Sequence, residues 1–161
     1  MCSGATSVSY VTQVLGMFHL EEVYAFTNDG ASACALTGYP SVEAYHVTAN
    51  GGPTQPVDGP LALAVSDGGS PVTAGTPASV DLAPGSSADV VLAFNGDSND
   101  GSCGTSIANL TDITLTPPGS TQASGLLTWA FNMCPSDGDN QIWVSPVMTP
   151  TAAHAAITGA G

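Results

Sequence analysis

The chain has 161 residues, with 13 Asp and Glu, three His and no Lys or Arg, so its formal net charge is −13. Without Lys or Arg side chains it cannot form their salt bridges or clamp a phosphate or a substrate carboxylate with them, which excludes most anion-binding functions. We therefore expect no binding to nucleic acid, and none to anionic membranes without a lipid anchor. The length indicates one domain, and an apolar fraction of 43% is enough for its core.

Hydrophobic alternation predicts strands in the first half of the chain. They are expected over residues 7–14, 20–27, 42–48 and 61–65. In the second of these, Leu20, Tyr24 and Phe26 recur on one face together with Glu22. Residues 51–60 hold three Pro and three Gly, which predicts a surface loop.

The second half continues the strand pattern. The turn Pro84-Gly85 follows Val80 and Leu82 and precedes an alternating run over residues 89–94, which predicts a hairpin with a buried face. Later strands are expected at residues 113–115, 127–131 and 142–144, with Trp129 and Phe131 in the core. Residues 148–161 are small and weakly patterned, so no element is assigned to them.

About eight strands without a helical period predict an all-β fold, a two-sheet antiparallel β-sandwich over residues 1–147. Residues 148–161 form a C-terminal segment outside this domain. A small closed barrel is the alternative.

Four cysteines are spread through the chain without any Cys-x-x-Cys pair. They are Cys2, Cys34, Cys103 and Cys134. Zinc and iron–sulfur sites normally bring their ligands in close pairs, so disulfides are the favoured interpretation, and they imply an oxidising compartment. The favoured pairs are Cys2 with Cys34 and Cys103 with Cys134, because each closes a moderate loop. Lipidation of Cys2 is the alternative, and it would leave one other thiol without a partner.

The sequence shows no basic leader region and no apolar run near the ~20 residues of a membrane span. For an exported protein we therefore expect that a leader has been removed and that Met1 was added.

Several segments follow one another in a recognisable order. They are Cys2, Tyr24-Ala25-Phe26-Thr27-Asn28, Cys34-Ala35-Leu36-Thr37-Gly38-Tyr39-Pro40, Leu82-Ala83-Pro84-Gly85-Ser86-Ser87-Ala88, Cys103 and Cys134. In content and order they resemble an actinobacterial family of secreted and lipoprotein domains of unknown function. The resemblance implies an immunoglobulin-like sandwich at the cell envelope and brings no catalytic residues with it. The absence of Lys and Arg departs from the family and argues against any role that depends on a basic surface.

No constellation for catalysis is recognisable. The chain has no Gly-x-Ser-x-Gly elbow, and His19, His46 and His154 are scattered. Adjacent strand residues point to opposite faces, so Glu21 and Glu22 do not form a carboxylate pair, and we expect both on a solvated edge. The sequence therefore predicts neither an enzyme nor a cofactor.

A metal site is the stronger minority interpretation. Met17 and His19 are copper ligands by type, although no second His-Met cluster supports them. The acidic loops at 97–101 and 137–140 have calcium-like chemistry without the full loop spacing. Tyr39, beside Pro40, is the best candidate for an exposed aromatic. The weak candidates for ligand contact are therefore Tyr39, Asp97, Asp100, Asp137 and Asp139.

These observations favour a non-catalytic, exported binding or structural module with an unidentified envelope or extracellular partner, and they leave self-assembly open. An extracellular calcium- or copper-handling protein is the second hypothesis. An enzyme with a site assembled from distant residues is the third.

Overall fold

The computed structural model describes residues 2, 6–16, 19–48, 55–56, 64–67, 75–95, 110–128 and 141–159, and every structural statement below concerns these residues. Strands dominate them, which confirms the prediction of a β protein. Cys103, Cys134, Trp129, Phe131 and both acidic loops lie outside the described residues.

The larger sheet has five strands. Its order is β1 (Thr6–Gly16), β2 (His19–Asn28), β8 (Ser87–Asn95), β11 (Gln141–Val144) and β6 (Ala64–Asp67). Neighbours are antiparallel except β11 and β6, which are parallel, so the prediction of purely antiparallel sheets is wrong for this pair. β1 and β2 pair along their whole lengths, with a bulge at Val11 where the register shifts.

A second sheet and a short ribbon complete the strands. The four-stranded sheet has the order β10 (Leu127–Thr128), β9 (Leu110–Thr116), β4 (Ser41–Thr48) and β5 (Gln55–Pro56). The ribbon pairs β3 (Cys34–Leu36) with β7 (Val80–Leu82). The sequence pattern predicts neither β3 nor β5, and β5 lies in the segment expected to be a surface loop.

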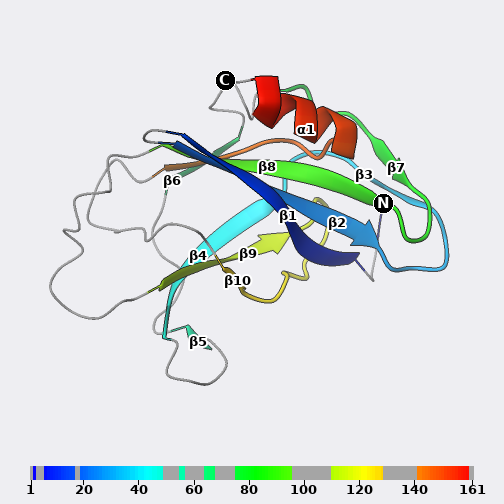
Figure 1. Cartoon of the computed structure of the whole chain (residues 1–161). Coiled ribbons are helices and arrows are strands. Elements are labelled where there is room, and N and C mark those ends of the chain that lie inside the picture. The colour runs from blue at the N-terminus through cyan, green and yellow to red at the C-terminus, as the bar shows by residue number, and fades with distance from the viewer. Residues whose placement is uncertain are drawn as a thin grey trace, which may run out of the picture.

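One hydrophobic cluster joins the facing sides of the two sheets. Its fully buried members include Leu20, Tyr24, Phe26, Val90 and Leu92 from the larger sheet and Ile113 and Leu115 from the smaller. Their period-two spacing follows from the alternation of side chains along a strand. In Figure 1, β4, β9 and β10 lie on one side of β1, β2 and β8, and the C-terminal helix lies on the other.

That helix, α1 (Pro150–Gly159), covers the outer face of β2 and β8. Pro150 opens it with a backbone already suited to a first turn, and the Thr149 hydroxyl accepts a bond from the Ala152 N–H at 3.3 Å. Ala153 and Ile157, one turn apart, pack on Val23 and Val91. Two buried residues in a run of small ones leave a weak periodic signal, so the sequence pattern does not reveal the helix.

Among the described residues, no helix is long and apolar enough to cross a membrane.

The hairpin predicted around Pro84-Gly85 is wrong. The turn forms, and the Ser86 N–H donates to the Ala83 carbonyl at 3.0 Å. However, β7 pairs with β3, whereas β8 pairs with β2 and β11. The turn therefore carries the chain from the ribbon into the larger sheet, because turn residues fix a reversal without choosing the partner of either strand.

Gly85 has a φ of +77°, a conformation that only glycine adopts without strain, and no atom lies within 4 Å of the position of an added Cβ. Gly85→Ala should therefore lower the free energy of unfolding by about 1–2 kcal/mol through backbone strain alone. Gly125→Ala is the matched control, because Gly125 has equal space and no positive φ. Urea unfolding of both variants measures the difference, and equal stability would contradict the strain argument.

Candidate functional site

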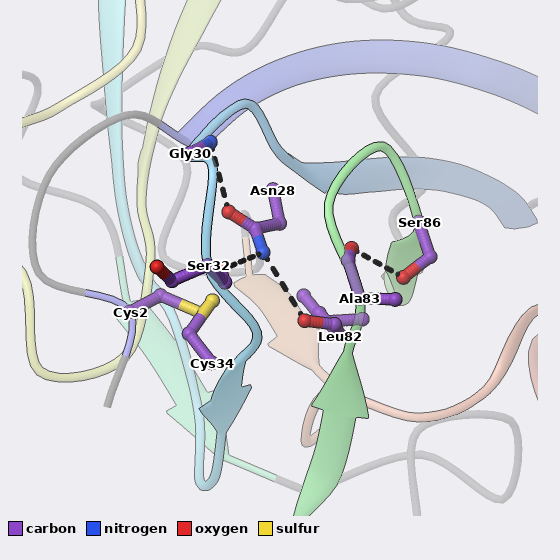
Figure 2. Close-up of a disulfide and its surroundings, with 8 residues drawn as sticks. All are labelled: Cys2, Asn28, Gly30, Ser32, Cys34, Leu82, Ala83 and Ser86. Atoms are coloured by element: carbon purple, nitrogen blue, oxygen red, sulfur yellow. Dashed lines mark hydrogen bonds between the residues drawn. A yellow bond between two sulfur atoms is a disulfide. The ribbon is translucent and has the colours of Figure 1, made fainter.

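The four described segments among those that carried the sequence resemblance meet at one corner of the molecule (Figure 2). Cys34 lies opposite Leu82 and Leu36 lies opposite Val80 in the β3–β7 ribbon. Asn28 ends β2 beside this ribbon and is only 3% exposed. Three segments distant in sequence thus form a single structural unit, which we call the Asn28 corner.

The Asn28 side chain uses both ends of its amide. Its Nδ2 donates to the carbonyls of Ser32 at 2.9 Å and Leu82 at 3.1 Å, and its Oδ1 accepts from the Gly30 N–H at 2.9 Å, as Figure 2 shows. Its backbone carbonyl accepts from the Gly85 N–H at 2.8 Å. A buried amide with two donors and an acceptor satisfied in this way fixes the path of three chain segments.

A disulfide joins Cys2 to Cys34 across 32 residues, with the Cα atoms 4.9 Å apart. The Cys2 N–H also donates to the Ala35 carbonyl at 3.1 Å, so backbone and side chain both hold Cys2 against β3. This pairing is the one favoured from the sequence. A crosslink over a loop of this size stabilises by about 3–4 kcal/mol on a chain-entropy model.

Residues Gly38 and Tyr39 also make structural contacts. Gly38 has a φ of +106°, and its carbonyl accepts from the Val147 N–H at 2.9 Å. Tyr39 is half-buried, and its hydroxyl donates to the Gly75 carbonyl at 3.3 Å. These contacts organise the backbone of this corner.

The remaining predicted ligand residues stay predictions. Asp97, Asp100, Asp137 and Asp139 lie outside the described residues, as does Met17. Within the described part of the chain, no three His, Cys, Asp or Glu side chains gather closely enough to hold a metal ion.

A cavity of about 390 Å³, which we call the Glu22 cavity, opens between β1 and β2 on one side and β10 on the other. It is lined by Tyr10, Gln13, Glu22, Tyr24, Leu127 and Thr128. The Tyr24 hydroxyl donates to Glu22 Oε2 at 2.5 Å, and the Tyr10 ring meets the Tyr24 ring edge-on at a centroid distance of 5.9 Å. Burial, followed by this hydrogen bond, raises the Tyr24 pKa well above its usual range, so Tyr24 remains a donor.

The expectation that Glu21 and Glu22 lie on a solvated edge is wrong. They are 5% and 1% exposed because β2 is an inner strand with the second sheet on one face and α1 on the other. The signal was present in the sequence, since Glu22 shares the apolar face of Leu20, Tyr24 and Phe26. A carboxylate placed among core side chains indicates a special site rather than an edge.

Two aspartates are also buried without a cationic side chain to compensate. Asp89 is 4% exposed on the face of β8 beneath α1, and Asp112 is 2% exposed on β9. Desolvation raises the pKa of both carboxyls. Asp112 Oδ1 is buried and has no hydrogen-bond partner in the described part of the structure.

A second hollow, of about 590 Å³, lies between α1 and residues 75–80. None of its lining residues is ionisable, and Val80, Pro146 and Met148 supply its larger apolar surfaces. The Glu22 cavity differs from it in having ionisable lining residues, among them the Glu22 carboxylate. The Glu22 cavity is therefore the candidate site for a cationic group.

The described strands and the disulfide-linked Asn28 corner define a small β protein. Comparison with protein families gives a match over residues 2–148 to the domain of unknown function DUF4232, and the chain belongs to that family. The helix α1 begins just beyond the matched residues. Neither a curated protein nor a protein of solved structure matches the chain significantly.

Asn28→Asp should lower the free energy of unfolding by about 2–4 kcal/mol, because it removes two donors and places a buried carboxylate against two carbonyl oxygens. Gln122→Glu is the matched control, since it makes the same chemical change at an exposed side chain. Urea unfolding at pH 7 provides the measurement. Equal losses in the two variants would show that added charge, rather than the corner, causes the effect.

Asp89→Asn should raise the Tm at pH 7. A carboxyl whose pKa is raised in the folded state contributes stability below its unfolded pKa of about 4, and loses that contribution as pH rises through the folded value. The neutral amide avoids this loss, so the gain should shrink as pH falls towards about 4. Each kcal/mol corresponds to roughly 2–4 °C in a chain of this size.

The control for this comparison is Asp81→Asn on β7, where the side chain is exposed. Melting curves of both variants between pH 4 and 8 decide the matter. A gain for Asp89→Asn that does not change with pH would contradict titration as its cause.

Proposed function

We propose that this protein is a non-catalytic module exported to the cell envelope or the extracellular medium of an actinobacterium, where it binds a partner or serves a structural role. The proposal includes an immunoglobulin-like sandwich and a second disulfide between Cys103 and Cys134. It includes no cofactor and no enzymatic activity.

The observation that carries the proposal is the structural role of the residues on which the sequence resemblance was based. Cys34 forms a disulfide, and the Asn28 side chain binds backbone carbonyls. Gly85 adopts a left-handed conformation in a turn. Motif residues that serve a reaction would instead direct a nucleophile, a base or an oxyanion donor into a pocket. Residues used in this way support a structural scaffold, on which a binding role would depend on other surface residues.

The disulfide supports export. Cys2 and Cys34 are bonded in the structure, and such bonds persist in oxidising compartments and are rare in the reducing cytosol. The charge supports a surface role, because 13 acidic residues without Lys or Arg keep copies of the protein apart and soluble.

The proposal predicts two disulfides in the native protein. Its four cysteines should resist alkylation until reduction, which should add two hydrogens for each bond and four in all. Intact mass before and after reduction measures this, on protein recovered from separated cytoplasmic, envelope and medium fractions. Four free thiols, or recovery from the cytoplasm alone, would contradict export.

Melting curves with added calcium or copper test the metal hypothesis on the same protein. A ligand that binds only the folded state must raise the Tm. A saturable rise with either ion would replace the proposed role with metal handling, whereas an unchanged Tm is the expected result.

A further inference from the structure

The strand β1 is an outer strand of the five-stranded sheet. One of its edges pairs with β2 from Thr6 to Gly16, and no described strand pairs with the other edge. Backbone N–H and C=O groups along an outer edge are a template for another strand. At 11 residues, β1 is long for an edge strand.

The side chains of β1 do little to block such pairing. The strand contains no charged residue and no proline, the two features that most often protect an edge. Tyr10, Val11 and Leu15 are 50%, 48% and 60% exposed, and they are the large hydrophobic side chains found exposed among the described residues. The bulge at Val11 is the one protective feature, and it leaves a regular stretch on each side.

The core-facing side of this edge opens onto the Glu22 cavity. Tyr10, Gln13 and Leu15 pair with residues Tyr24, Glu22 and Leu20, so they share the face that points towards the second sheet. Tyr10 and Leu15 are nevertheless exposed. Alternate side chains of a strand added to β1 would cover this face and reach the cavity that holds the Glu22 carboxylate.

The net charge of the chain indicates which kind of partner β1 could bind. A second copy of the chain brings another 13 acidic residues and no Lys or Arg, so two edges meet against mutual repulsion. A segment rich in Lys or Arg meets the opposite potential, which accelerates its encounter and favours the complex. We propose that β1 pairs with an extended, cationic segment of another protein, which joins the larger sheet as an additional strand. This inference rests on the proposed binding role and names its surface and partner class.

The test uses the whole disulfide-bonded protein and a synthetic peptide of about ten residues in which Lys alternates with Val or Thr. Two control peptides accompany it. One replaces every Lys with Glu, and the other keeps every Lys but has Pro at two central positions, which preserves charge and prevents strand pairing. Titration calorimetry measures affinity, and backbone hydrogen exchange measures protection over residues 6–16.

Two variants on β1 and a control variant on α1 locate the contact. Leu15→Lys places a cation on the exposed edge, and His154→Lys places a cation on the exposed surface of α1. Leu15→Lys should lower the affinity for the cationic peptide about tenfold, because it adds local repulsion and removes an apolar contact. His154→Lys should change that affinity by less than about twofold. Ser9→Lys, also exposed, tests the stretch of β1 before the bulge. Melting curves establish that each variant is folded.

The proposal is supported if the cationic peptide binds, if β1 gains protection from hydrogen exchange, and if either β1 variant lowers the affinity. Any of four results overturns it: no binding at low salt, equal binding of the proline peptide, equal weakening in His154→Lys, or a wild-type dimer by sedimentation that Leu15→Lys dissociates. Fractionation and thiol mass test the exported module separately, so failure here would leave that proposal standing.

Discussion

Every carboxylate in this chain must be accommodated without a lysine or an arginine. Solvation meets this demand on the surface, but Glu22, Asp89 and Asp112 are almost fully buried. Glu22 receives the Tyr24 hydroxyl, a neutral donor that burial itself keeps protonated. The two aspartates respond instead with raised pKa values, because protonation is the remaining way to reduce the cost of burying their charge. The interior is thus coupled to pH at sites where most proteins would place an ion pair.

The same constraint explains why the Asn28 corner matters. In an ordinary domain, an arginine with five donors often ties distant segments together. Here the Asn28 amide, two tight turns and a disulfide do so with no net charge. Such contacts do not weaken with salt, whereas an exposed ion pair would. The contacts that hold this corner are therefore insensitive to ionic strength, although the surface carries a large net charge.

The sequence pattern located most strands because alternation in stretches such as Ile113–Leu115 follows directly from burial of one face. It could not choose partners. The Pro84-Gly85 turn reverses the chain in either pairing, and only the packing of β7 against β3 decides between them. Helix α1 escaped because Ala and Thr give a weak period, and its contacts with Val23 and Val91 are tertiary. Because the helix was not predicted, burial of Glu21 beneath it could not be predicted either. The Glu22 cavity needed both sheets, although a Glu within an apolar strand face was a readable sign of it.

Net charge and the open edge of β1 depend on one another. An uncharged, partly apolar edge strand invites pairing between copies, and most proteins prevent this with a charge on the strand itself. β1 itself carries no charged residue, so the repulsion between two copies comes from acidic residues elsewhere in the chain rather than from this edge strand. That arrangement keeps like molecules apart and leaves the edge chemically ready for a partner of opposite sign. Repulsion of this kind fades as carboxylates protonate near pH ~4, where the buried acids become better accommodated. Acid therefore has two opposing effects. It lowers the cost of the buried carboxyls in the folded state, and it removes the repulsion that keeps the β1 edges of two copies apart.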